Sequence, residues 1–270
     1  MDNISLRKLQ LIETDILKIV DKFCKKHDIK YSLYAGTALG AVRHGGFIPW
    51  DDDIDICMTR PDYERFLKLW REQGEEGYAL QGTDNPNYEY INFSKIRKIG
   101  TKFGTEFDVK AYGEDNVGIF LDVFPFDKVP NDKRKRKKFL FNVKLWLVYT
   151  RGYAYTRGGT FLKLISKLLL LKSRKRQLKI RNKLEKKILS YQSMEKDYSL
   201  ASLACPASLK NIFPADILDQ VQEIDFEDTK ASIYKDYDTA LRITFGNYMQ
   251  LPPEQERVCK HEPFIFDVGE

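Results

Sequence analysis

The chain has 270 residues, of which 43% are hydrophobic and 31% are charged, and its formal net charge is +6 at pH 7. This composition is that of a globular protein with a substantial core. No uninterrupted apolar stretch approaches the roughly twenty residues of a transmembrane helix, which excludes a membrane-spanning protein. The four cysteines lie far apart without metal-ligand spacing, so we expect reduced thiols.

The first 26 residues carry apolar side chains at helical spacing among charged ones. The apolar positions are Leu9, Ile12, Ile16, Ile19, Val20 and Phe23. This pattern predicts an amphipathic helix and not a signal peptide, so we expect a cytoplasmic protein.

A strand, a glycine turn and a helix are predicted next, between residues 31 and 43. The strand covers 31–35, and Gly36 allows another group to approach the backbone closely. Thr37 can cap the following helix and offer its hydroxyl, so that free N–H groups at the helix start would face a phosphate. The alternative is a Gly-Thr turn with a purely conformational role.

An acidic run, Trp50 to Ile56, follows about fourteen residues after the turn. Asp53 and Asp55 alternate with Ile54 and Ile56, so in a strand over 53–58 both carboxylates would project from one face. Two carboxylates held this close need a cation, and Mg²⁺ (or Mn²⁺ in its place) suits oxygen ligands and substrate phosphates. For Asp51 and Asp52, a solvated turn or a helix cap is the alternative.

Further strands are predicted at 78–82, 90–97, 103–109 and 117–124, with a helix at 61–73. Asp122 stands at the centre of the apolar run 118–125. A carboxylate in such a strand is normally paired or bound to metal. We therefore predict that Asp122 completes the metal site or accepts the proton of a nucleophile; the alternative is a salt bridge to a cation such as Arg97.

Several other side chains are candidates for contact with substrate. Arg43 and either Lys95 or Arg97 could neutralise further phosphate oxygens, although each could equally be a structural cation. His44 could contact phosphate or stabilise the following glycine turn. Trp50 could stack on a base or cover the edge of the core.

The positive charge is concentrated between Lys133 and Lys187. This segment has twenty Lys and Arg residues and a single acid, Glu185, so the rest of the chain carries about −13. An apolar stripe edged by lysines, at 161–169, suits a helix lying on an anionic membrane at its inner face. The alternative is a helical lobe with a solvated basic face, and the lack of a recognition motif argues against nucleic acid.

The stretch Tyr34–Ile56 resembles the signature of the LicD family, which includes bacterial phosphocholine transferases and is related to the fukutin-type ribitol-phosphate transferases. A second stretch, Phe245–Arg257 with His261 after it, is similar to the C-terminal motif of that family. The resemblance implies a nucleotidyltransferase-like fold in which Gly36 and Thr37 hold the phosphates of the donor. It also implies that Asp53, Asp55 and Asp122 hold magnesium and that His261 lies at the site.

We therefore expect an α+β fold with a mixed sheet flanked by helices and a basic helical lobe. The expected division is a catalytic core over 1–130, the lobe over 131–204 and a C-terminal segment over 205–270 that returns to the core. The expected reaction is transfer of a phospho-alcohol, phosphocholine from CDP-choline foremost, to a glycan or lipid-linked glycan with release of CMP. Nucleotidyl transfer from an NTP and a non-catalytic membrane- or polymer-binding role are the alternatives.

Overall fold

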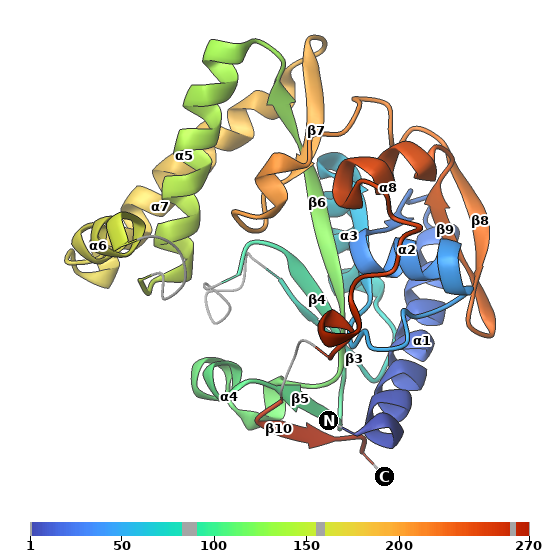
Figure 1. Cartoon of the computed structure of the whole chain (residues 1–270). Helices are drawn as coiled ribbons and strands as arrows, with labels where there is room; N and C mark the ends of the chain where they lie inside the picture. Colours follow the sequence, from blue (N-terminus) through green and yellow to red (C-terminus); the bar gives the residue numbers. More distant parts are fainter. Residues whose placement is uncertain (1, 83–90, 155–159, 260–262, 270) are drawn as a thin grey trace. The chain divides into compact units, whose positions relative to one another are not determined.

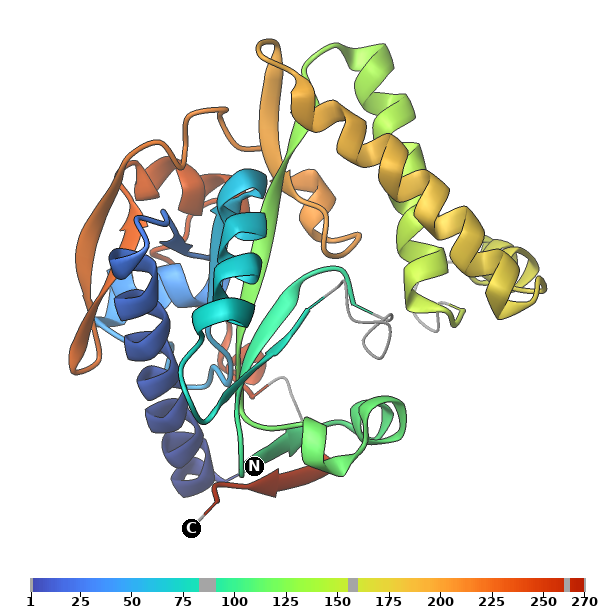
Figure 2. The same ribbon diagram turned by 180° about the vertical axis from the view of Figure 1, so that it is seen from behind.

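The computed structural model describes residues 2–82, 91–154, 160–259 and 263–269, and Figures 1 and 2 draw it from opposite sides. The chain divides into two compact units. Unit 1 comprises residues 1–82, 93–125 and 216–270, and unit 2 comprises residues 83–92 and 126–215.

The main sheet has the strand order β1, β2, β6, β4, β3, and β7 also pairs with β6. The strands are β1 (Ser32–Leu33), β2 (Asp55–Thr59), β3 (Tyr78–Gln81), β4 (Ser94–Lys98), β6 (Phe120–Pro130) and β7 (Tyr198–Ser202). β6 pairs antiparallel with β4 over residues 120–123 and with β7 over residues 126–130. Pro125, which has no N–H group to donate, lies between the two paired segments.

The helices described in unit 1 are α1 (Asn3–Lys26), α2 (Ala35–His44), α3 (Arg60–Gln73), α4 (Glu106–Tyr112) and α8 (Tyr237–Phe245). α1 begins after Asp2, whose carboxylate accepts a hydrogen bond from the Ser5 N–H at 2.8 Å. α1 and α3 lie side by side in front of the sheet in Figure 2, and the Phe23 ring of α1 contacts Phe66 and Trp70 of α3. These aromatic contacts place the apolar faces of both helices in one core.

Two smaller sheets are described in unit 1. β5 (Lys102–Gly104) pairs with β10 (Ile265–Asp267), and β8 (Val221–Phe226) forms a hairpin with β9 (Thr229–Tyr234). The hairpin packs on the start of the main sheet, because the backbone N–H of Tyr234 donates to Ser32 Oγ at 2.9 Å. Short 3₁₀ turns lie at Glu114–Asn116 and Glu254–Glu256.

Unit 2 is built on α5 (Lys133–Arg151), α6 (Thr160–Leu169) and α7 (Arg174–Leu189), with 3₁₀ turns at Ser190–Ser193 and Ser208–Lys210. Apolar residues of α5, α7, β6, β7 and the segment after β7 form its core: Val129, Phe139, Val143, Trp146, Leu147, Ile188, Ala201, Leu203 and Leu209. The Asp132 carboxylate caps α5 by accepting from the Lys135 N–H at 2.8 Å. No helix within the described ranges has both the length and the apolar content that a membrane-spanning segment needs.

The predicted α+β fold, with a central sheet flanked by helices, is confirmed. The strand predicted over 103–109 is wrong beyond Gly104, because α4 begins at Glu106. Thr105 Oγ1 accepts from the Asp108 N–H at 3.2 Å and the Asp108 carboxylate accepts from the Thr105 N–H at 2.9 Å, which is a capping box that starts a helix. The division at residues 130 and 204 stays a prediction.

Candidate active site

Three consecutive carboxylates gather in the loop that precedes β2. One carboxylate oxygen each from Asp51, Asp52 and Asp53 lies within 4.8 Å of the other two. Asp52 is fully buried and Asp51 is 8% exposed. Buried carboxylates without a compensating cation are costly, and oxygen donors are what Mg²⁺ and Mn²⁺ take. The donor set therefore fits a divalent cation, and the solvated-turn alternative for Asp51 and Asp52 does not match their burial.

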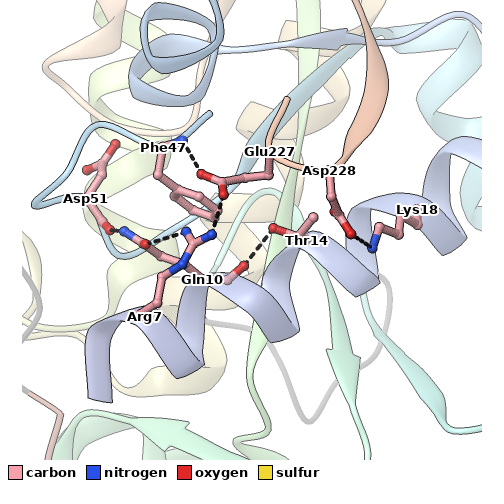
Figure 3. Close-up of polar contacts among 8 residues, drawn as sticks. All are labelled: Arg7, Gln10, Thr14, Lys18, Phe47, Asp51, Glu227 and Asp228. Atoms are coloured by element: carbon pink, nitrogen blue, oxygen red, sulfur yellow. Dashed lines mark hydrogen bonds and ion pairs between the residues drawn. The ribbon is translucent and has the colours of Figure 1, made fainter. Parts of the chain in front are cut away.

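Contacts from distant segments fix the acidic loop. The side-chain amide of Gln10 on α1 donates to the backbone oxygen of Asp51 at 2.9 Å, as Figure 3 shows. The thiol of Cys259 donates to Asp52 Oδ2 at 2.8 Å. In the same view, Glu227 accepts from the Phe47 N–H at 3.0 Å and binds the guanidinium of Arg7 on α1 at 2.5 Å.

The glycine turn approaches the acidic loop directly. A Cβ atom added to Gly36 would lie 2.6 Å from Asp51 Oδ2, so only glycine leaves room for that carboxylate. Ala35, just before it, has a φ of 46°, a left-handed conformation that strains a residue with a side chain. The turn therefore lies against the carboxylates, and a phosphate contact at Gly36 stays a prediction.

Thr37 does not cap the helix, which corrects one prediction. α2 already begins at Ala35, and its N-cap is Tyr34, which makes no side-chain capping bond. Thr37 is buried inside the first turn, and its Oγ1 accepts from the Asp55 N–H at 2.8 Å. The hydroxyl therefore links the turn to the start of β2, and a phosphate contact by Thr37 stays a prediction.

Asp55 is the first residue of β2, and Asp53 lies just before that strand. Ile54 and Ile56 are fully buried, as their alternation with the carboxylates predicts. Burial, then the charges of Asp53, Asp122 and Asp51, raise the pKa of Asp55 well above its usual range, against the influence of Lys95. Asp55 thus shares one electrostatic environment with the acidic loop and with β6.

Asp122 joins this environment from β6. Its N–H donates to the Ile54 oxygen at 2.8 Å, and it stands opposite Lys95 in the β4–β6 ladder. Lys95 Nζ lies 2.5 Å from Asp122 Oδ1 and 3.3 Å from the centre of the Phe120 ring. Burial lowers the pKa of Lys95, an effect that the Asp122 charge opposes. Lys95 is therefore a partner of Asp122, and the salt bridge predicted as the alternative is present with that lysine.

The other basic residues predicted to contact substrate donate hydrogen bonds to groups of the protein. Buried Arg97 donates through Nε to Gln81 Oε1 and through Nη1 to the Gly118 oxygen, so its guanidinium is held by protein acceptors. Arg43 Nη1 donates to the Tyr248 oxygen at 2.9 Å. Substrate contact by either arginine, or by Lys95, stays a prediction.

Two further residues predicted to contact substrate, His44 and Trp50, lie between the first turn of α2 and β2. His44 is the last residue of α2 and is largely exposed. Desolvation of the part that is covered, and then the charge of Arg43, lower the pKa of its imidazole. The Trp50 ring lies 5.9 Å from the guanidinium carbon of Arg257, a cation–π contact. His261 lies outside the described residues.

Sequence reasoning missed Gln10, Glu13 and the role of Cys259. A signal for the first two was present: both fall on the apolar stripe of the first helix, where a polar side chain needs an explanation. Cys259 is more than two hundred residues from Asp52, and no pattern in the sequence connects them.

The fold and the acidic loop define a nucleotidyltransferase-type protein with a candidate divalent-cation site. The sequence profile described as "LicD/FKTN/FKRP, nucleotidyltransferase domain" matches residues 28–153. The chain is also 30% identical to the lipopolysaccharide cholinephosphotransferase LicD of Haemophilus influenzae, over 97% of both chains. The chain belongs to the LicD family, and this relationship indicates a transferase enzyme.

Shorter matches are found in two uncharacterized rickettsial proteins. One from Rickettsia prowazekii is 37% identical over 43% of this chain and 39% of its own length. One from Rickettsia typhi is 38% identical over 24% of this chain and 21% of its own.

Proposed function

We propose that this protein transfers phosphocholine from CDP-choline to a hydroxyl of a cell-surface glycan or its lipid-linked precursor, with release of CMP. The observation that carries the proposal is the group of carboxylates Asp51–Asp53 held against Gly36. The similarity to a cholinephosphotransferase over nearly the whole chain supports the choice of donor, and its name supports lipopolysaccharide among the acceptors, beside teichoic acid and capsule precursors.

Asp53 is the residue that we assign first to the cation. The sequence predicted Asp53 as a metal ligand together with Asp55 and Asp122. In the structure, a carboxylate oxygen of Asp53 lies close to those of Asp51 and Asp52. When bound, Mg²⁺ would neutralise oxygens of the donor diphosphate and the charge that develops on CMP. The backbone N–H groups at the start of α2, beside Gly36, would bind the same phosphates.

Asp122 is placed to accept a proton. The acceptor oxygen would attack the phosphorus of phosphocholine while the bond from that phosphorus to the CMP oxygen breaks, and the hydroxyl proton would pass to the Asp122 carboxylate. The ammonium of Lys95 lies 2.5 Å from Asp122 Oδ1 and would hold that carboxylate in position.

The basic segment 133–187 supports a lipid-linked acceptor at the inner membrane face. On and just after α6, the side chains of Leu164, Leu168 and Leu171 are 56%, 55% and 79% exposed, and Lys167 and Lys172 are exposed among them. Exposed leucines with lysines at their edges suit the surface of an anionic bilayer. The side chains of Phe161 and Leu162, which belong to the predicted stripe, lie outside the described residues.

The test is a calorimetric titration of the purified protein with CDP-choline, CDP-ribitol, CDP-glycerol and CTP, with and without Mg²⁺. The titration is repeated on Asp53→Asn and on Asp115→Asn, which removes an exposed carboxylate as a control. We expect Mg²⁺-dependent preference for CDP-choline in the wild type and the control, and its loss in Asp53→Asn. Preference for another CDP-alcohol would change the donor.

The same titration separates the other classes of function. Preference for CTP, followed by pyrophosphate release in a turnover assay, would identify a nucleotidyl transfer instead. Absence of nucleotide binding under every condition would contradict the enzyme and favour a role in membrane or polymer binding.

A further inference from the structure

A fourth buried acid, Glu13, lies on α1 and has no role in the proposed reaction. Its side chain is fully buried, and neither carboxylate oxygen has a hydrogen-bond partner within the described part of the chain. Buried carboxyl groups in this state are rare, because the lost hydration is not replaced. Such a group needs a ligand or a neutral, protonated form.

Helix geometry places Glu13 beside the acidic loop. Gln10 and Glu13 are three residues apart, so they are neighbours on one face of α1. Gln10 holds the backbone oxygen of Asp51 at 2.9 Å from this face, as Figure 3 shows. Thr14, the next residue, is turned back to its own helix, where its hydroxyl donates to the Gln10 oxygen at 2.7 Å.

The largest electrostatic influences on Glu13 come from other carboxylates. Burial, followed by repulsion from Asp53, Asp52, Asp51 and Asp122, raises the pKa of the Glu13 carboxyl well above its usual range. An additional acid in a group of like charges is unfavourable unless a cation enters the group.

We propose that Glu13 is part of the divalent-cation site and contacts the bound cation or a water molecule in its shell. The proposal rests on the cation site that the preceding function assigns to Asp51–Asp53. It gives α1, which lies outside the segments matched by the sequence signature, a direct part in the site. A bound cation would supply the partner that both Glu13 oxygens lack.

The test measures Mn²⁺ affinity directly, by electron paramagnetic resonance of free Mn²⁺ without any nucleotide. The variants are Glu13→Gln, which keeps the shape and removes the charge, and Asp15→Asn, which removes an exposed charge from the same helix. We expect Glu13→Gln to lower the affinity at least tenfold and Asp15→Asn to leave it unchanged. Without metal, Glu13→Gln is expected to melt at or above the wild-type temperature, because it removes an unpaired buried acid.

Two further variants keep the outcomes distinct. Glu13→Asp, with a shorter reach, is expected to bind Mn²⁺ between the wild type and Glu13→Gln, and it replaces the latter if Glu13→Gln does not fold. Wild-type affinity in Glu13→Gln together with weakened binding in Asp53→Asn would overturn this inference and leave the proposed function standing. Absence of Mn²⁺ binding by the wild type would overturn both.

Discussion

Unit 1 and unit 2 differ in the sign of their characteristic charges and in the burial of those charges. The acids of the candidate site in unit 1 are buried, whereas the basic residues that open α5 in unit 2 are mostly exposed. In unit 1, Glu13 and Asp52 are fully buried and Asp51 and Asp122 are nearly so. In unit 2, the helix α5 opens with six consecutive basic residues at 133–138, of which all but Arg136 are exposed. These positive charges stand at the positive end of the helix dipole, where they are unfavourable.

The difference shows which charges are informative about function. A solvated lysine costs little free energy, so the basic helices by themselves imply only attraction to anionic surfaces. A buried carboxylate among other carboxylates has a large desolvation cost, so the acidic group is one that could hold a specific cation. Substitutions of the buried acids in unit 1 should therefore change metal binding, and substitutions on the surface of unit 2 should not.

The largest effect is expected for Asp53→Asn. Because the amide cannot replace a carboxylate at the cation, CMP release should fall by about a thousandfold or more, comparable to the loss of a key electrostatic group. The melting temperature without metal should not fall, because a repelling charge is removed. Activity is measured as CMP release from the preferred donor, with Asp115→Asn as the control. Wild-type turnover by Asp53→Asn would contradict the assignment.

Lys95→Met should give the largest loss of stability. It leaves the buried Asp122 carboxylate without its cation, which costs about 3–5 kcal/mol. The free energy of unfolding is measured in urea with EDTA, and the double variant Lys95→Met/Asp122→Asn should recover part of the loss. Excess Mg²⁺ should also reduce the loss if Asp122 faces the cation. Equal losses in the single and double variants would show that the pair is not coupled.

Gly36→Ala should affect binding more than stability. The new methyl group meets the end of the Asp51 side chain, which can move, so the free energy of unfolding should fall by only about 1 kcal/mol. The displaced carboxylate should lower Mn²⁺ affinity at least about tenfold, because one ligand of the group is lost. The comparison is Gly118→Ala, whose Cβ would meet the Lys98 backbone oxygen at 2.3 Å and should therefore destabilise the fold more. Unchanged Mn²⁺ affinity in Gly36→Ala would contradict the close approach of the Asp51 carboxylate to Gly36.

Charge reversal on the basic segment should affect only surface binding. Lys167→Glu and Lys172→Glu should each weaken binding to phosphatidylserine vesicles by at least about 1 kcal/mol, with the effect lost at high salt. Sedimentation with vesicles measures this, and Lys230→Glu in β9 is the control in unit 1. Stability and Mn²⁺ affinity should not change. Equal vesicle binding by all variants would identify the basic face as a solvated surface.

Ala35→Gly should give the smallest effect, in the opposite direction. Glycine adopts the left-handed conformation of residue 35 without strain, so the free energy of unfolding should rise by about 1 kcal/mol or less. Urea unfolding measures this change. A loss of stability would show that the methyl group of Ala35 contributes packing that outweighs its strain.

Local patterns predicted the parts of the fold that depend on local contacts. The alternation of Asp53, Ile54, Asp55 and Ile56 indicated both the buried isoleucines and the acidic site beside them. The capping box at Thr105 was also readable in the sequence, but the prediction continued the strand through it. The β8–β9 hairpin was not predicted, because its turn at Glu227 and Asp228 lacks the usual glycine or asparagine and Glu227 takes a φ of 54°.

The contacts made by the site residues were harder to predict from the sequence than the identity of those residues. Asp122 was recognised as an unusual carboxylate, but its pairing with Lys95 was not foreseen, because it depends on the register of β4 and β6, which places Lys95 opposite it. Glu13 and Gln10 were overlooked because their neighbours fit an ordinary amphipathic helix. Which polar residue on a buried face meets which loop is decided by tertiary packing, which periodicity does not report.

The contacts of Glu227 have a consequence for the order in which the site assembles. Glu227 holds Phe47, 180 residues earlier in the chain, and Arg7, 220 residues earlier. During synthesis, the acidic loop would leave the ribosome long before the hairpin that fixes it, because domains take shape as the chain emerges. A nascent chain that stops before residue 227 would have all its Asp51–Asp53 carboxylates but not their final arrangement. Metal binding would then begin only near the end of synthesis.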